Sequence, residues 1–325
     1  MSHHHSARGA GVAAALLLTA AAAAAPATAQ PAATDPRAAL VVDAAWLAQH
    51  LHDPDLVLLH VGEKSRYDAA HIPGARHVPL SAIDGSGHSG GAMGDGPMLE
   101  LPATDVLRER LAVLGISDDS RIVVYYGEDW VTPATRVVFT LDHAGLGART
   151  SLLDGGMAAW QRAGGTVTRD VPAVKPGRLS PLRTRALVVD APWVRAHVGR
   201  PGYAVLDARA RAFYDGVQTG GGPDAPHRAG HVPGARSLPY SEIATDDLTL
   251  RAPAALAALF REAGVAPGDT VVAYCHIGQQ ATAVLFAART LGHPVLLYDG
   301  SFEDWSARRD YPVETGAPSS PGRRP

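Results

Sequence analysis

Cysteine is nearly absent from this chain of 325 residues, which contains one, Cys275. A single thiol excludes an internal disulfide. No cluster of His, Cys and acidic residues follows metal-ligand spacing, so the sequence predicts no metal and no organic cofactor. A lone cysteine is a buried apolar side chain, a liability or a working thiol, and its surroundings in the sequence must decide between these.

An excess of basic charge is missing as well. The 29 Lys and Arg residues are balanced by 32 Asp and Glu residues, which leaves a net charge of −3. A chain this close to neutrality shows no sign of nucleic-acid binding.

A long apolar run is the third absence, because the run over 12–25 has about 14 residues. That is short of the ~20 needed to cross a bilayer. Arg8 precedes the run, and Ala27-Thr28-Ala29 follows it as a small-x-small cleavage pattern. We therefore expect a signal peptide over 1–29, and a periplasmic or secreted mature protein with no membrane association after cleavage. An uncleaved anchor or a misplaced start codon is the alternative.

The two halves of the chain repeat each other. Three segments of the first half recur in the same order in the second half, which indicates a duplicated domain. The pairs are His71-Ile72-Pro73-Gly74-Ala75-Arg76 with His231-Val232-Pro233-Gly234-Ala235-Arg236, Ile122 to Gly127 with Thr270 to Cys275, and Asp154-Gly155-Gly156 to Trp160 with Asp299-Gly300-Ser301 to Trp305. The distance in sequence between paired segments differs from one pair to the next, because each half has its own Gly-rich insertion.

Short apolar strands alternate with helical stretches in each half. This order is typical of an α/β fold, a mostly parallel sheet flanked by helices. The expected strands are 57–61, 122–126, 150–153, 204–207, 270–274 and 295–297, and the expected helices are 103–114, 133–143, 252–263 and 281–291. We expect an N-terminal domain over 38–164, a linker over 165–185 rich in Pro, Gly, Arg and Thr, and a C-terminal domain over 186–314.

Cys275 stands where the apolar run 270–274 ends and a short loop leads into the helix predicted over 281–291. Unpaired backbone N–H groups and the positive end of a helix dipole stabilise an anion at such a place. We therefore interpret Cys275 as a nucleophile. The first half has Gly127 at this position, followed by Glu128 and Asp129. It is predicted to be inactive and to pack against the mouth of the second site.

The tandem halves, the two H-[IV]-P-G-A motifs, the D-G-G-x-x-x-W and D-G-x-x-x-x-W motifs and the strand that ends at Cys275 resemble the two-domain rhodaneses. These are thiosulfate and 3-mercaptopyruvate sulfurtransferases. The resemblance covers about 40–311 and implies two rhodanese-like α/β domains. It also implies that Cys275 takes a sulfane sulfur from a small-molecule donor as a persulfide and passes it to cyanide or a thiol.

In that family a six-residue loop binds the sulfur through its backbone amides. The corresponding residues here are His276, Ile277, Gly278, Gln279 and Gln280. Each charge-assisted bond from an amide contributes about 1.5–3 kcal/mol, so two or three of them stabilise a thiolate without a nearby cation.

The chain departs from the family at the positions that select the donor. Relatives that favour thiosulfate have cations at the two positions after the Cys, and those that favour mercaptopyruvate have Gly and Ser. Here these positions are His276, which we expect to carry positive charge near neutral pH, and Ile277. Phe213 replaces the family's donor-binding Arg. Arg211 is the expected substitute, since residues i and i+2 of an extended segment face one side. Arg209 is the second binding candidate, with an ion pair to Asp207 as the alternative.

Three other functions are alternatives to sulfur transfer. Cysteine phosphatases of related fold need an Arg six positions after the Cys, and Ala281 stands there. A persulfide carrier that delivers sulfur to a partner protein fits the same residues, and so does a thiol peroxidase that lacks a resolving Cys. A reductant or sulfur-accepting protein is then a possible partner. His71 would join the site only across a cleft between the domains, and a structural role in its turn is the alternative.

Overall fold

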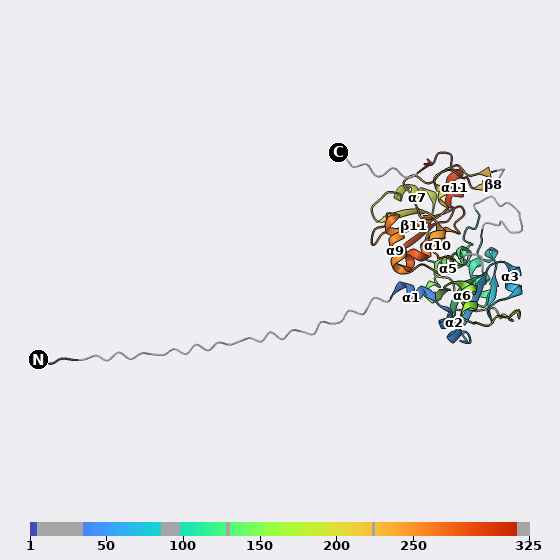
Figure 1. Cartoon of the computed structure of the whole chain (residues 1–325), viewed down its shortest axis with the longest axis horizontal. Coiled ribbons are helices and arrows are strands. Elements are labelled where there is room, and N and C mark those ends of the chain that lie inside the picture. The colour runs from blue at the N-terminus through green and yellow to red at the C-terminus, as the bar shows by residue number, and fades with distance from the viewer. Residues whose placement is uncertain (5–34, 86–97, 128–130, 223–224, 317–325) are drawn as a thin grey trace. The chain divides into compact units, whose positions relative to one another are not determined.

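A computed structural model describes residues 1–4, 35–85, 98–127, 131–222 and 225–316 of the chain (Figure 1). Nearly all of the predicted signal peptide over 1–29 lies outside these residues, as do Glu128 and Asp129. Both halves of the repeat belong to one compact unit, Thr34–Pro325.

The first half forms a five-stranded sheet in which every neighbouring pair of strands is parallel. Its strands in spatial order are β1 (Val41–Val42), β5 (Thr150–Leu153), β4 (Arg121–Tyr126), β2 (Leu56–Val61) and β3 (Arg76–Val78). The helices are α1 (Pro36–Leu40), α2 (Ala44–His50), α3 (Lys64–Ala69), α4 (Thr104–Val113), α5 (Thr132–His143) and α6 (Gly156–Arg162), with 3-10 turns η1 (Leu80–Ala82) and η2 (Gly147–Arg149).

The second half repeats this sheet, again with parallel neighbours throughout. Its strands in spatial order are β10 (Arg236–Ser237), β7 (Tyr203–Asp207), β11 (Thr270–Tyr274), β12 (Val295–Tyr298) and β6 (Val188–Val189). The helices are α7 (Ala191–His197), α8 (Arg211–Tyr214), α9 (Pro253–Glu262), α10 (Ala281–Thr290) and α11 (Ser301–Ala307), with η3 (Tyr240–Glu242) and the antiparallel ribbon β8 (Gly221–Gly222) and β9 (Ala225–Pro226).

Helices cover both faces of each sheet, as the strand–helix alternation predicts. In the first half, Leu107 of α4 packs on one face and Leu47 of α2 on the other. In the second half, Phe260 of α9 and Trp305 of α11 occupy the corresponding places. The central strands are therefore buried on both sides, which explains their nearly continuous apolar sequence.

The ten predicted strands and helices are all present, and no end differs by more than one residue. The edge strands β1, β3, β6 and β10 were not predicted, because two or three residues carry no recognisable period. Among the described residues, no helix has the length and apolar character needed to cross a membrane.

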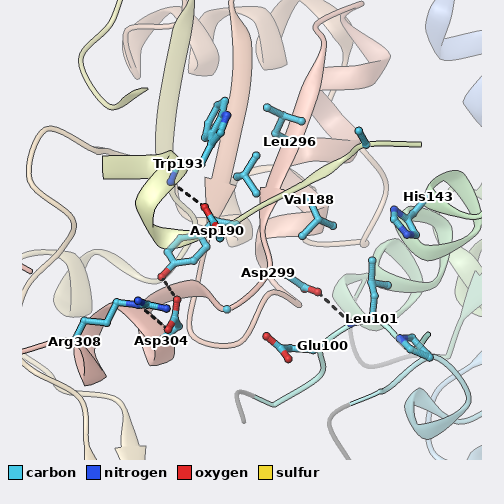
Figure 2. Close-up of a pocket in the computed structure, with 15 residues that line it drawn as sticks. Glu100, Leu101, His143, Val188, Asp190, Trp193, Leu296, Asp299, Asp304 and Arg308 are labelled. Atoms are coloured by element: carbon cyan, nitrogen blue, oxygen red, sulfur yellow. Dashed lines mark hydrogen bonds and ion pairs between the residues drawn. The ribbon is translucent and has the colours of Figure 1, made fainter. Parts of the chain in front are cut away.

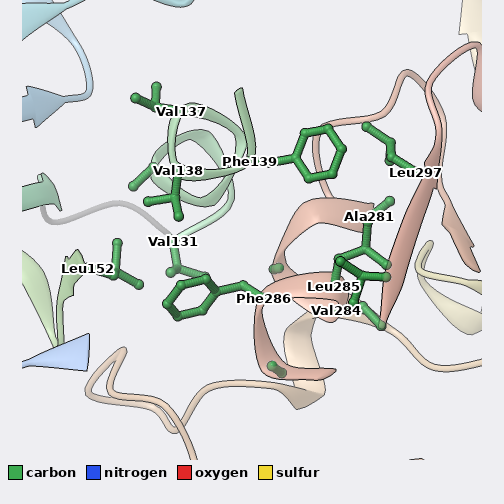
Figure 3. Close-up of a cluster of buried hydrophobic side chains, with 14 of the residues drawn as sticks. Val131, Val137, Val138, Phe139, Leu152, Ala281, Val284, Leu285, Phe286 and Leu297 are labelled. Carbon is green, nitrogen blue, oxygen red and sulfur yellow. The ribbon is translucent and has the colours of Figure 1, made fainter. Parts of the chain in front are cut away.

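The two halves share one apolar core between α5 and α10, the helices that follow Gly127 and the Cys275 loop. Phe139 points from α5 toward the second half, and Phe286 points from α10 toward Val131 (Figure 3). The hydroxyls of Thr135 and Thr282 are hydrogen-bonded across this contact at 2.9 Å. The start of α10, and with it the Cys275 loop, is therefore supported by the first half.

Candidate active site around Cys275

Cys275 lies at the carboxyl end of β11, the central strand of the second sheet, and is fully buried. Its backbone N–H donates to the Ser301 hydroxyl at 3.2 Å. Its carbonyl accepts from the Phe302 N–H at 3.0 Å, and the His276 carbonyl accepts from the Glu303 N–H at 3.1 Å. Both carbonyls are thus occupied by the first turn of α11.

The loop N–H groups have no such partners. Within the described parts of the chain, none of the backbone N–H groups of residues 276–280 has a protein acceptor. Unsatisfied donors between a strand and the start of a ten-residue helix form a cradle for an anion. The geometry agrees with the expected role of His276, Ile277, Gly278, Gln279 and Gln280 as sulfur-binding amides, which stays a prediction.

Gly278 is required by this loop for two reasons. Its φ is +80°, in the left-handed region where side chains are disfavoured. A Cβ would also lie 2.9 Å from both the carbonyl oxygen and Oδ1 of Asp299, and 3.0 Å from Nη1 of Arg136. The loop therefore packs directly on a buried ion pair.

The first half contacts this loop through α5. Arg136 Nη1 donates to the Gly278 carbonyl at 3.2 Å, and Gln279 Nε2 donates to the Thr132 hydroxyl at 3.1 Å. The first half therefore packs against the second site, as expected, while its inactivity stays a prediction. The contacts are made directly to Gly278 and Gln279 of the loop.

Arg209 is placed by the structure in a buried ion pair. Its guanidinium binds Asp207 through Nη2 at 2.6 Å and Nε at 3.0 Å, and donates to the Gly230 carbonyl at 2.7 Å. It also stacks over the ring of Phe302, 4.0 Å from the centroid. The interpretation of Arg209 as a substrate-binding residue is therefore not supported, and the ion-pair alternative describes it.

The argument for Arg211 was wrong in its geometry. Arg211 begins the helix α8 and is exposed, whereas we expected an extended segment. Residues two apart on a helix point in different directions. The ring of Phe213 instead packs edge-on against His276, with centroids 4.6 Å apart. Arg211 therefore does not take the place of Phe213 beside His276.

The expected positive charge on His276 is also wrong. Burial, the nearby Arg209 guanidinium and His227 together lower the pKa of His276 to about 4. The imidazole is neutral near pH 7. His227 belongs to the insertion of the second half, and burial followed by Arg209 lowers its pKa as well. Gly220 fits closely over both rings, since a Cβ there would lie 2.6 Å from Nδ1 of His276 and 3.0 Å from Nδ1 of His227.

The two motif histidines are structural. His71 is fully buried, with Nδ1 at 2.8 Å from the Tyr67 carbonyl oxygen and Nε2 at 3.1 Å from the Asp170 carbonyl oxygen. His231 is equally buried and bonded to the Tyr214 carbonyl at 2.8 Å. The backbone of each also pairs with the segment that follows its domain, His71 with Thr168 and His231 with Glu314.

A cavity of about 980 Å³ lies beside the site without containing the thiol (Figure 2). Glu100 and Leu101 of the first half line it together with Asp299 and Gly300, and residues 275–280 do not. In the first half, a smaller cavity of about 340 Å³ includes Gly127, the counterpart of Cys275. Among the described residues, no three His, Cys, Asp or Glu side chains lie close enough together to bind a metal ion.

Four residues at the site were missed from sequence: Arg136, Thr132, His227 and Ser301. Arg136 had a readable signal, because it is the one charged residue in the stretch from Ala134 to Leu141. His227 had none, since an insertion carries no pattern that shows what it will cover.

The comparisons with known proteins agree with this architecture. The family model described as "Rhodanese-like domain" matches residues 43–163 and 190–308. A probable 3-mercaptopyruvate sulfurtransferase of Pseudomonas aeruginosa is 33% identical over 86% of this chain and 99% of its own length. The sulfur carrier protein TtuD of Thermus thermophilus is 28% identical over 85% and 97%.

The crystal structure of YnjE superposes with a TM-score of 0.75 at 24% identity, covering 87% of this chain and 70% of that one, which shows the shared fold. Two matched domains, two equivalent parallel sheets and a cysteine at the end of one central strand lead to a single conclusion. The chain is a member of the rhodanese family of sulfurtransferases, with two rhodanese-like domains in tandem.

Proposed function

We propose that the chain transfers a sulfane sulfur from thiosulfate or 3-mercaptopyruvate to a thiophilic acceptor through a persulfide on Cys275. One observation carries the proposal: a buried thiol at the end of a central strand, followed by five backbone N–H groups that no described protein atom accepts. The catalytic cysteine occurs in the second domain alone, because the first has Gly127 at that place.

The chemistry divides into two displacements. The Cys275 thiolate attacks the outer sulfur of thiosulfate, the S–S bond breaks, and sulfite leaves with the electron pair. With 3-mercaptopyruvate the C–S bond breaks instead, and the pyruvate enolate that leaves takes up a proton. Cyanide then attacks the outer sulfur of the persulfide, and thiocyanate leaves while the thiolate is restored. The loop amides stabilise the anionic sulfur in both steps.

Both donors are anions, and the mouth of the site offers them little positive charge. His276 is neutral, Ile277 is apolar, and Phe213 occupies the family's arginine position. Arg209 is already bound to Asp207. We expect a weak apparent affinity for the thiosulfate dianion for this reason.

The low charge of the mouth also favours a second candidate, a carrier that holds a persulfide for a partner protein. The similarity to TtuD supports this candidate, because that relative is named a sulfur carrier protein. A partner would bring its own acceptor thiol, so the carrier needs no free cation for a small donor. For the carrier, we propose a thiol reductant or a sulfur-accepting protein as the partner.

The deciding experiment compares the protein from Gln30 onward with its Cys275→Ser variant. Thiosulfate and 3-mercaptopyruvate are supplied separately with cyanide, and thiocyanate is measured. We expect turnover that disappears in Cys275→Ser. A mass increase of one sulfur on Cys275 without turnover would favour the carrier. If turnover and the persulfide are both absent, both functions are refuted.

We further propose export, with residues 1–29 as a cleaved signal peptide and the mature protein in the periplasm or outside the cell. The support is the apolar run over 12–25 and the cleavage pattern that ends at Ala29. Cell fractionation and N-terminal sequencing test this, and we expect a mature chain that begins at Gln30. An intact N-terminus in the cytoplasmic fraction would overturn it.

A further inference from the structure

Arg136 is a buried charge in α5, followed by three apolar residues of the core. Its relative exposure is 0%, and Val137, Val138 and Phe139 beside it belong to the core. A guanidinium is rarely buried to this degree unless it is paired, because desolvation of an unpaired charge is costly. Its partners therefore indicate its role.

All the partners of Arg136 lie at the boundary between the halves. Nη1 binds Asp299 Oδ1 at 2.6 Å and the Gly278 carbonyl at 3.2 Å, and Nη2 donates to the Leu99 carbonyl. The other Asp299 oxygen accepts from the Leu101 N–H at 3.1 Å (Figure 2). Arg136 and Asp299 thus join the first half to the middle of the Cys275 loop.

The internal repeat shows that this arrangement is one-sided. Gly127 and Cys275 are equivalent positions 148 residues apart, and the same offset pairs Arg136 with Val284. The half that lacks the thiol has the arginine, and the half that has the thiol has an apolar residue there. A cation needed only to join two equivalent helices could lie on either copy. This one lies where it reaches the loop that has the cysteine.

The contact acts on one peptide group of the loop. The Gly278 carbonyl and the Gln279 N–H belong to the same planar trans peptide, so they point in opposite directions. A cation on the oxygen fixes the direction of the N–H and strengthens it as a donor. The Gln279 side chain is held by Thr132 on the same helix, which restrains that peptide from its other end.

We propose that Arg136 is a positioning residue for sulfur transfer. It orients and polarises the 278–279 peptide across the domain boundary, so that the Gln279 N–H stabilises the anionic sulfur of Cys275. The proposal rests on the proposed function for its importance in turnover. Its test does not, because alkylation of the single thiol needs no sulfur donor.

The variants are Arg136→Met, which removes the charge but keeps a long side chain, and Arg136→Lys, which keeps the charge but lacks the planar guanidinium group. Arg37→Gln is the matched control. Arg37 also joins the halves, through the Arg251 carbonyl at 3.0 Å, and it pairs with Asp154 of the first half at 3.4 Å. It has no contact with residues 275–280 among those described. The iodoacetamide reaction of Cys275 is followed against pH, along with turnover and urea unfolding.

We expect Arg136→Met to raise the pH midpoint of alkylation by about one unit and to lower turnover by about tenfold or more, the effect of losing one charge-assisted contact. Arg136→Lys should be intermediate. Arg37→Gln should lower stability but leave the midpoint unchanged. If Arg136→Met does not fold, Arg136→Lys supplies the test. An unchanged midpoint in the folded Arg136 variants, or an equal shift in Arg37→Gln, would overturn the proposal.

Discussion

Replacing Gly278 with alanine tests the loop geometry most directly, because the chain offers a matched control. Gly278 has φ +80° and is buried, whereas Gly268, in the turn before β11, has φ +85° and is exposed. A Cβ on Gly278 would meet Asp299 at 2.9 Å and Arg136 at 3.0 Å, and a Cβ on Gly268 would meet nothing within 4 Å. The two substitutions therefore share the backbone strain and differ in the contacts.

The strain of a left-handed alanine lowers the free energy of unfolding by about 1–2 kcal/mol in both variants. Overpacking against the buried ion pair adds about 1–3 kcal/mol in Gly278→Ala alone. We expect losses of about 1–2 kcal/mol for Gly268→Ala and about 2–5 kcal/mol for Gly278→Ala, measured by urea unfolding with similar m-values.

The reactivity of Cys275 is the second quantity to measure in these two variants. A displaced Gly278 moves the amides on both of its sides, so alkylation and turnover should fall in Gly278→Ala and remain normal in Gly268→Ala. Equal losses of stability would show that the close approach of Asp299 is unimportant. Normal thiol reactivity in Gly278→Ala would refute the role of the loop amides.

Two further predictions concern charge. Asp207→Asn leaves the buried Arg209 guanidinium without its carboxylate, and should lower the free energy of unfolding by about 3–5 kcal/mol. Asp68→Asn breaks an exposed pair with Lys64 and should change the free energy of unfolding by less than about 1 kcal/mol. Similar losses for the two variants in a urea titration would contradict the expected difference between a buried and an exposed pair. The pKa of His276 is lowered from 6.5 to about 4 on folding, so the unfolded state binds more protons in that window. Stability should fall as pH drops from 6.5 to 4, and less steeply in His276→Asn. An identical slope in that variant would refute the assigned pKa.

The sequence was sufficient for the parts of the fold that have long periodic signals. The central strands 122–126 and 270–274 are nearly continuous apolar runs. The helices α4 and α9 bury residues four apart, Leu107 with Leu111 and Leu256 with Phe260. The duplication revealed Gly127 as the counterpart of Cys275, and so assigned the candidate site to one half. These inferences depend on local sequence and on comparison of the chain with itself.

The errors arose where distant residues decide the outcome. The pKa of His276 depends on burial and on charges at Arg209 and His227, and His227 comes from an insertion that no local pattern places there. Arg209 is bound by Asp207, which leaves its guanidinium directed into the protein. The prediction for Arg211 failed because the residues form the short helix α8, where we expected an extended segment.

The contact between α5 and α10 has a consequence for how the protein unfolds. Buried residues from both sheets form one continuous apolar cluster through these helices, and Phe139 and Phe286 each point into the other half's side of it. Neither half can lose its structure without exposing core that belongs to both. Two domains by sequence should therefore melt as one cooperative unit, with equal calorimetric and van't Hoff enthalpies.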